Sequence, residues 1–264
     1  MRFNQSNYIG SRPASVLSKP KLAAPIEQEK DRAEAAGATI ESGVYTDLID
    51  PVYDILNGAG VWSDVTAFHV AGVRDVVSGS QSKWYDQSGN QNDATQSTSS
   101  ARPTDTTASG FNGHVVGDFD PNDDILDSLA SATQPNVLIA VHRPDNNIAY
   151  AIDSDPDRQV LGIEGTSGNR FIFASSVVES SGTETSAILT GVYDGANSVL
   201  RVDNTQTQSG DAGTNDMNTL YYNGNPNTRR DAQAIAVGIV IDSRPSTSVL
   251  SDVETALNDY YSIY

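Results

Sequence analysis

The chain has 264 residues, 38% of them hydrophobic, with a formal net charge of −18 and no cysteine. The lack of cysteine excludes disulfides and cysteine-bound zinc, so stability must come from packing. The strong negative charge argues against a nucleic-acid partner, because phosphate binding needs clustered Lys and Arg side chains. No apolar run approaches the roughly 18 residues that a membrane-spanning helix needs, so no membrane span is predicted.

Residues 1–25 are predicted to form an extended arm, because they contain three prolines and no sustained apolar period. The arm is basic, although the rest of the chain is strongly acidic. This split in charge indicates that the arm lies across an acidic neighbour. The residues expected to attach it are Arg2, Arg12, Lys19 and Lys21.

Residues 26–60 are predicted to form a leader of two short helices. Pro25 is favourable in a first helical turn, and Gly37 is a typical stop, so the first helix is expected between them. Asp50 is expected to cap the second helix and Gly58 to lie just past its end.

From residue 61 onward, short runs rich in Val, Ile, Phe and Tyr alternate with Gly, Asn, Asp and Ser, which predicts a β-sandwich or barrel. A final helix is expected from Ser246, because Leu250, Val253 and Leu257 form one apolar stripe. The predicted strands are TAFHVAGV (66–73), HVVGDF (114–119), NVLIAVHR (136–143), IAYAI (148–152), RFIFASSVV (170–178), SAILTGVYD (186–194), SVLRVD (198–203) and AIAVGIVI (234–241).

Four segments together resemble the concanavalin A-like lectin/glucanase superfamily, including its laminin-G-like members. They are KWYDQSGNQNDATQ (83–96), GDFDPNDDILDS (117–128), ILTGVYDGANSVLRVDN (188–204) and VLSDVETALNDYYSIY (249–264). The resemblance implies an all-β jelly-roll sandwich over residues 61–264, with an outer C-terminal helix. One departure is Pro121, which stands where the family pattern has glycine.

The leader is similar to a segment that precedes lectin-like sandwiches in tailed-phage virion proteins, with an Ala-rich helix and the spacing Leu56-x-x-x-Gly60-x-Trp62. This resemblance implies a structural protein of the virion, either a capsid decoration or a fibre-type protein. It further implies a virion-surface location after assembly in the host cytoplasm. The expected partners are other virion proteins, bound through the arm, and further copies of the same chain.

The segment KWYDQSGNQNDATQ raises a question of its own, because it is polar yet contains one of only two tryptophans. We expect Trp84 and Tyr85 to be buried, with Asp86, Ser88 and neighbouring polar side chains bonding the turn's own backbone. The alternative is that these rings stack on a sugar.

That alternative predicts a carbohydrate-binding module for cell-surface glycans, because aromatic faces and amide side chains match sugar rings and hydroxyl groups. The residues expected to contact a glycan are Trp84, Tyr85, Tyr221, Tyr222, Asn223 and Asn225.

Catalytic patterns are absent from the sequence, so the chain is predicted not to be an enzyme. Retaining glucanases of this superfamily carry Glu-x-Asp-x-Glu, and serine hydrolases carry Gly-x-Ser-x-Gly; neither occurs here. A glycosidase is the less favoured alternative and would need carboxylates from separate strands. The neighbours Asp123 and Asp124 are interpreted as part of a turn, and His69, His114 and His142 as hydrogen-bonded sheet residues.

No cofactor is required by the sequence, but two acidic segments have the oxygen ligands that calcium prefers. The segment DSDPDRQVLGIE (153–164) follows a calcium-loop spacing, yet Arg158 replaces the required glycine, so an acidic hairpin turn is favoured. The segment DFDPNDD (118–124) is the second. The candidate ligands are Asp153, Asp155, Asp157 and Glu164 in the first segment, and Asp118, Asp120, Asn122 and Asp124 in the second.

Overall fold

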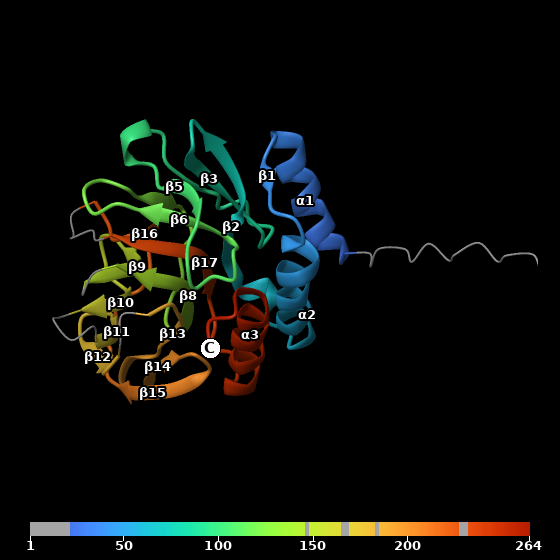
Figure 1. The fold of residues 1–264 in the computed structure, drawn as a ribbon. Coiled ribbons are helices and arrows are strands. Elements are labelled where there is room, and N and C mark those ends of the chain that lie inside the picture. Colours follow the sequence, from blue (N-terminus) through green and yellow to red (C-terminus); the bar gives the residue numbers. More distant parts are fainter. Residues whose placement is uncertain (1–21, 146–147, 165–168, 183–184, 227–231) are drawn as a thin grey trace, which may run out of the picture.

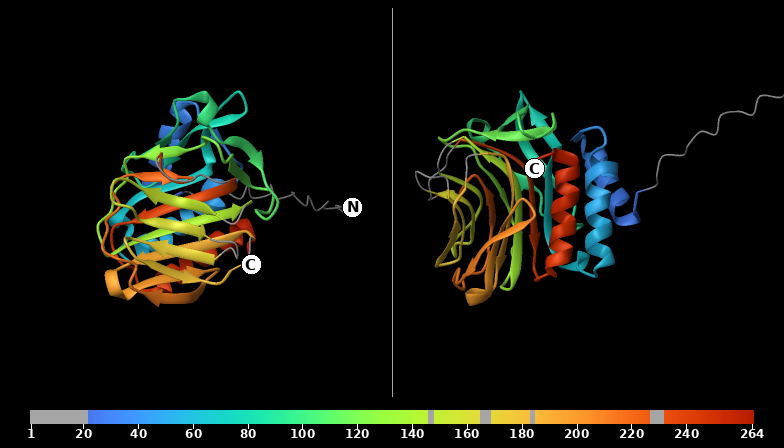
Figure 2. Two further views of the ribbon diagram at one scale, coloured as in Figure 1. Left: turned by 90° about the vertical axis from the view of Figure 1, so that its left-hand side faces the viewer. Right: turned by 60° about the horizontal axis from the view of Figure 1, so that its bottom comes forward.

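The computed structural model describes residues 22–145, 148–164, 169–182, 185–226 and 232–264, so the predicted attachment residues Arg2, Arg12, Lys19 and Lys21 lie outside the described residues. Antiparallel strands are stacked in two layers, and three α-helices lie on one side of them (Figure 1, Figure 2). The predicted all-β class, with helices near both ends, is confirmed. Among the described residues, no helix is both long and apolar enough to cross a bilayer.

The layer next to the helices, here called the covered sheet, has the strand order β2-β17-β8-β13-β14-β15. The other layer, the outer sheet, has the order β4-β7-β16-β9-β10-β11-β12. The covered sheet comprises β2 (Val65–Val77), β8 (Asn136–Pro144), β13 (Ala187–Tyr193), β14 (Ser198–Val202), β15 (Thr205–Gly210) and β17 (Gln233–Ile241). The outer sheet comprises β4 (Ala94–Thr95), β7 (Leu126–Ser128), β9 (Ala149–Ser154), β10 (Val160–Glu164), β11 (Asn169–Phe173), β12 (Val177–Ser180) and β16 (Leu220–Tyr222).

Four further strands extend or connect the layers. The strand β3 (Ser80–Asp86) pairs with β2 and also with β4, and β6 (Val115–Phe119) pairs with β17 and with β5 (Thr104–Thr107). The short β1 (Thr39–Ile40) pairs with β2. The two layers therefore belong to one continuous hydrogen-bonded set.

The central strands of the covered sheet are buried on both faces. Along β8, Val137, Ile139 and Val141 belong to the apolar cluster shared with the helices. The intervening Leu138 and Ala140 belong to the cluster between the two sheets. A strand buried on both faces has a continuous apolar sequence instead of an alternating one, which explains the uninterrupted runs of β8 and β17.

The first and last helices follow the predicted start and stop signals. The helix α1 (Ala24–Ala36) has Pro25 in its first turn and ends at Gly37, whose φ of 88° is left-handed and accessible to glycine without a Cβ clash. The helix α3 (Thr247–Tyr261) is capped by Ser246, whose side-chain oxygen accepts a hydrogen bond from the Val249 N–H.

The second helix differs from the prediction at both ends. The helix α2 (Asp50–Gly58) continues directly from a π-helical turn, η1 (Tyr45–Ile49), so Asp50 does not cap it and Gly58 is its last residue. The Asp50 carboxylate instead accepts a hydrogen bond of 3.0 Å from the backbone N–H of Ala23. Asp50 thus caps the start of α1 and joins the two leader helices.

The leader and α3 pack on the covered sheet as one unit. Ile26 and Leu56 from the leader share an apolar cluster with Ile239 of β17. On α3, the buried Glu254 accepts two hydrogen bonds, of 2.9 and 2.8 Å, from Arg201 of β14. Loss of either partner would leave a buried charge unpaired, so this ion pair fixes the position of α3.

The polar turn after Trp84 is organised by one buried carboxylate, that of Asp86. It accepts backbone N–H hydrogen bonds from Phe68, Ser88 and Asn92, and a fourth bond from the Ser88 hydroxyl, at 2.7–3.0 Å. The prediction that these polar side chains bond the turn's own backbone is confirmed.

The substitution Asp86→Asn is expected to destabilise the protein by at least roughly 2 kcal/mol, because the amide NH₂ cannot accept and leaves buried donors unpaired. Urea denaturation measures this loss. The control is Asp31→Asn, which removes an exposed charge on α1 and should change stability by less than about 0.5 kcal/mol. Equal stability of the Asp86 variant and the wild type would contradict the assigned role.

Candidate functional site

Trp84 and Tyr222, two of the predicted glycan contacts, are fully buried between the sheets. Their ring centroids lie 4.9 Å apart. Gly238 makes room for Tyr222, because a Cβ there would lie 2.0 Å from the tyrosine hydroxyl oxygen. These rings are core residues, and the prediction that they contact a sugar is wrong.

Three other predicted glycan contacts are also buried. The Tyr85 hydroxyl donates a 2.9 Å hydrogen bond to Asp75, and its ring is 2% exposed. The side-chain amide of Asn223 donates to the Asp124 carbonyl at 2.9 Å, and that of Asn225 donates to the Ser154 carbonyl at 3.2 Å. Burial and internal bonding remove Tyr85, Asn223 and Asn225 from the surface, so Tyr221 is the one remaining candidate of the original six.

The first predicted calcium segment forms a hairpin turn between β9 and β10, as the favoured interpretation held. The buried Asp153 carboxylate accepts two hydrogen bonds, of 3.0 and 2.9 Å, from Arg158. Asp157 accepts a bond from Asn218. Arg158 therefore pairs with the Asp153 carboxylate, and Asp153, Asp155 and Asp157 are not among the described carboxylates that are spaced to share one metal ion. Glu164 ends β10, and its side chain lies outside the described part.

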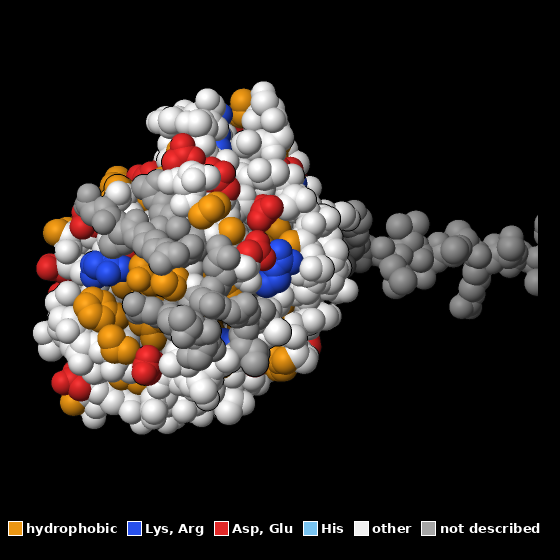
Figure 3. Space-filling model, turned by 60° about the vertical axis from the view of Figure 1, so that its left-hand side comes forward, with side chains coloured by type: hydrophobic (Ala, Val, Ile, Leu, Met, Phe, Trp, Pro, Cys, Tyr) orange, Lys and Arg blue, Asp and Glu red, His pale blue; other side chains and the backbone are white. Residues whose placement is uncertain are grey.

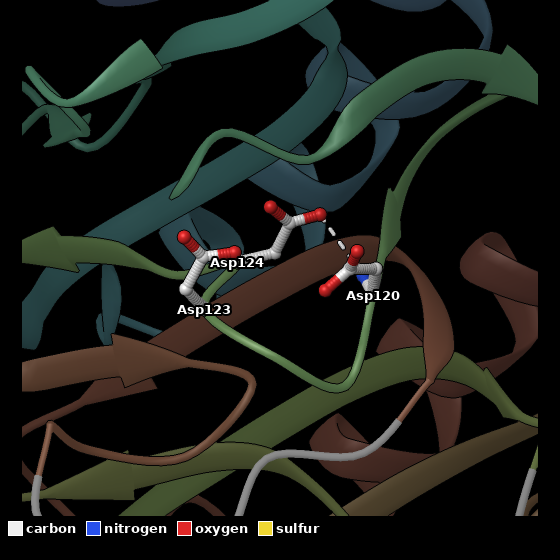
Figure 4. Close-up of side chains that lie close together, drawn as sticks. All are labelled: Asp120, Asp123 and Asp124. Atoms are coloured by element: carbon white, nitrogen blue, oxygen red, sulfur yellow. Dashed lines mark hydrogen bonds between the residues drawn. The ribbon is translucent and has the colours of Figure 1, made fainter. Parts of the chain in front are cut away.

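The second predicted segment does gather carboxylates in the loop between β6 and β7 (Figure 4). Asp120, Asp123 and Asp124, here called the carboxylate triad, each offer an oxygen within 4.8 Å of the others. Asp118 lies in β6 outside this triad, and the Asn122 N–H donates to Asp120 at 2.7 Å. The sequence interpretation missed Asp123.

The charged form of Asp124 is disfavoured by its surroundings, and a bound cation would stabilise that form. Burial raises the pKa of Asp124 to about 7, and the nearby carboxylates of Asp120 and Asp123 add to the rise, although a hydrogen bond from the Asp120 N–H opposes it. Oxygens bound to one Ca²⁺ at 2.3–2.6 Å lie within about 5 Å of each other. The spacing and the hard oxygen donors of the triad fit calcium.

An open cavity of about 480 Å³ lies beside the triad. The strand register explains why Tyr221 and Asp127 both line this cavity. Tyr221 of β16 is paired with Asp127 of β7 and with Asp153 of β9. Side chains of paired residues lie on the same face of a sheet, and Tyr222 next in sequence points to the opposite, buried face. The lining residues are Gln96, Thr98, Ala101, Asp123, Ile125, Asp127, Tyr221 and Pro226.

The cavity combines a half-buried aromatic ring with polar groups. Burial raises the pKa of Tyr221, with smaller effects of the Asp127 and Asp155 carboxylates, so the phenol stays neutral and can donate. The Thr98 hydroxyl can donate and accept, and Asp127 can accept, whereas the Gln96 amide is bonded to the Ile125 carbonyl and to the Thr98 N–H. Sequence patterns missed Gln96, Thr98 and Asp127, because no local motif connects β4, β7 and β16. Figure 3 shows acidic, basic and apolar side chains intermixed on this side of the molecule.

None of the three histidines lines the cavity. The His69 Nε2 lies 2.7 Å from the Asn92 carbonyl, and its Nδ1 lies 2.9 Å from the Tyr222 hydroxyl. The carbonyl can only accept, so Nε2 donates to it and Nδ1 accepts from the tyrosine. The prediction of a hydrogen-bonded sheet residue is confirmed for His69. The His142 Nδ1 lies 3.4 Å from the Gln233 Oε1, whereas its buried Nε2 has no partner among the described residues.

The chain matches no protein-family model and no curated protein sequence. Solved structures with a similar fold include a GH54 α-L-arabinofuranosidase soaked with a cyclic sulfate inhibitor, at 11% identity and a TM-score of 0.58, over 80% of this chain and 65% of that one. The binding domain of Paraclostridial Mosquitocidal Protein 1 aligns at 12% identity and a TM-score of 0.53, over 76% and 53%.

The botulinum neurotoxin serotype D ligand binding domain, in complex with N-acetylneuraminic acid, aligns at 11% identity and a TM-score of 0.52, over 75% and 52%. The chain therefore spans less than two thirds of each of these structures. At this identity the likeness concerns the fold, which is of a β-rich type found in glycosidases and in ligand-binding domains of toxins.

The raised pKa of Asp124 predicts a pH dependence of stability in the absence of metal. A carboxyl whose pKa is raised on folding stabilises the protein fully below its unfolded pKa of roughly 4, and this contribution is lost as the pH rises toward 7. Thermal denaturation in chelator should show the melting temperature falling between pH 5 and pH 7.5, and falling less in Asp124→Asn. Identical profiles for both proteins would contradict the assignment.

Proposed function

We propose that the chain is a carbohydrate-binding module, built on a concanavalin A-like jelly-roll framework, that binds a glycan in the cavity beside the triad. The observation that carries the proposal is Tyr221, a half-buried aromatic ring in an open cavity. An aromatic ring can pack on the apolar face of a sugar, and Thr98 and Asp127 can bond its hydroxyl groups. Most ligand sites likewise combine apolar surface with a few convergent polar groups.

The structures of similar fold support this proposal at the level of the fold. One is a ligand binding domain in complex with N-acetylneuraminic acid, and another is an arabinofuranosidase. Fold analogy does not carry function by itself, so the cavity residues remain the main argument. We place binding before hydrolysis, because the sequence has no Glu-x-Asp-x-Glu pattern.

The virion role rests on the resemblance of the leader and stays a prediction, as do the virion-surface location and the assembly into homo-oligomers. It is compatible with glycan binding, because a particle can display a lectin-like sandwich. The cavity belongs to β4, β7, β16 and their loops, and the leader packs on the covered sheet. A glycan in the cavity would not compete with the leader for the same surface.

Tyr221→Ala is expected to weaken glycan binding tenfold or more, because it removes the aromatic face, whereas Tyr221→Phe should retain most of the affinity. A glycan array identifies the ligand, and isothermal titration calorimetry measures the change. The matched control is Tyr264→Ala, which removes a tyrosine ring that is 51% exposed and does not line the cavity. Unchanged affinity in Tyr221→Ala, or no glycan bound by the wild type, would refute the proposal.

We include calcium in this proposal, held by Asp120, Asp123 and Asp124 with backbone carbonyls or waters completing its coordination. Calcium is expected to raise the melting temperature of the wild type and to have little effect on the double variant Asp120→Asn/Asp123→Asn. Calorimetric titration compares calcium with magnesium. A specific calcium site binds calcium more tightly, whereas screening of charge affects the protein equally with either ion. A melting temperature insensitive to calcium would exclude the cation from the proposal.

A further inference from the structure

Arg170 of β11 is a buried cation with which no described residue pairs. It is 6% exposed, and its Nε has no hydrogen-bond partner. Within the described residues it forms no ion pair either. Two other arginines are as deeply buried, but Arg74 is bonded twice to the Asp105 carboxylate and Arg201 twice to that of Glu254. A buried charge without such a partner is costly, so Arg170 invites an anion.

The Asp203 carboxylate affects Arg170 without forming an ion pair with it. Burial lowers the pKa of Arg170, and the charge of Asp203 opposes this effect. Asp203 accepts a 2.8 Å hydrogen bond from the Ile188 N–H, and burial raises its own pKa. The positive charge of Arg170 is therefore balanced only in part by Asp203.

The side chains of Arg170 and His142 both point into the layer between the two sheets. Ile172 of β11 belongs to the apolar cluster of this layer, and Arg170, two residues before it, lies on the same face. From the opposite sheet, Leu138 and Ala140 of β8 belong to the same cluster, and His142 continues their face. The charge of Arg170 contributes to lowering the pKa of His142, so the two groups lie near each other.

His142 supplies a second unpaired group. The Gln233 NH₂ donates to the Tyr150 carbonyl and to the Asn223 Oδ1, which fixes the orientation of its amide. The Gln233 Oε1 can only accept, so the His142 Nδ1 donates to it and Nε2 is an acceptor. Burial lowers the pKa of His142 to about 4, so the ring is neutral near pH 7. An unpaired donor and an unpaired acceptor thus face one layer.

We propose that Arg170 and His142 bind a small protonated oxyanion, one with a negative charge and an O–H group, such as hydrogen carbonate or dihydrogen phosphate. Its charged oxygens would accept hydrogen bonds from the guanidinium, whose forked donors match oxyanions. Its O–H would donate to the His142 Nε2. The site lies in the interior between the sheets and goes beyond the proposed glycan binding, because neither residue lines the cavity around Tyr221.

Other occupants match the two groups less well. Chloride or nitrate would balance the charge of Arg170 but has no proton for the His142 Nε2. A water molecule could bridge the two groups, but it would leave the charge unbalanced. Ala187, paired with His142, leaves more room on this face than a larger residue would. The net charge of −18 disfavours anions at long range, but salt screens this effect beyond roughly 8 Å at physiological ionic strength.

The test measures binding of sodium bicarbonate and sodium nitrate to the full chain at pH 8, by calorimetric titration at an ionic strength held constant with gluconate. Nitrate is planar and monovalent like hydrogen carbonate but lacks the O–H. We expect nitrate to bind roughly tenfold more weakly, because it leaves the buried Nε2 unpaired. Inorganic phosphate at pH 6, where its monoanion predominates, is the second probe. The tighter of the two protonated probes identifies the ligand as planar or tetrahedral.

Arg170→Met should abolish binding without loss of stability, because it removes an unpaired buried charge and keeps an unbranched stem. His142→Asn, whose NH₂ replaces Nδ1 as the donor to Gln233, should still bind anions but lose the preference over nitrate. The control Arg244→Met removes an arginine whose side chain is 39% exposed, and it should bind like the wild type.

Melting temperatures establish that the three variants fold. Equal affinity of the wild type for nitrate and hydrogen carbonate would overturn the assignment of a protonated ligand. Binding that persists in Arg170→Met, or a wild type that binds neither bicarbonate nor phosphate, would overturn the site itself and leave a water molecule between Arg170 and His142. The proposed glycan binding would stand in each of these cases.

Discussion

The arrangement of the two layers depends most on the hydrogen bonds that the buried Asp86 carboxylate accepts. It joins β2, β3 and the following turn through four hydrogen bonds, so the chain can leave the covered sheet and enter the outer sheet at β4. Arg32 of α1 donates to the Asp86 carbonyl at 2.7 Å and to the Asp93 carboxylate at 3.1 Å. The same polar turn therefore connects the two sheets and binds the leader helix α1.

The two sheets differ in which of their faces are buried. Helices cover one face of the covered sheet, and the outer sheet covers the other, so its central strands have no surface left for a ligand. Within the part of the chain that the structure describes, no helix covers the far face of the outer sheet (Figure 2). The strands β7 and β16 pair Asp127 with Tyr221, so these two side chains lie on one face. The candidate site lies where the fold leaves polar side chains accessible.

The error in predicting glycan contacts has a simple geometric cause. Tyr221 and Tyr222 are adjacent and chemically alike, but successive residues of a strand point to opposite faces. One side chain lines the cavity, and the other packs against Trp84 in the core. Composition identified an aromatic pair, and the strand register decided which member reaches solvent. The interpretation of Asp123 and Asp124 as part of a turn is confirmed, because both residues lie in the loop between β6 and β7.

The sequence by itself determined the β-rich class, the main strands, α1 and α3, and the structural purpose of the polar turn after Trp84. These features depend on local patterns: apolar runs, proline and glycine at helix ends, and Asx-rich turns. Three features were decided only by the tertiary structure. Asp50 caps α1, Arg158 pairs with Asp153, and a cavity forms around Tyr221. Each of these depends on partners distant in sequence or on strand register, and both are set by packing of the whole chain.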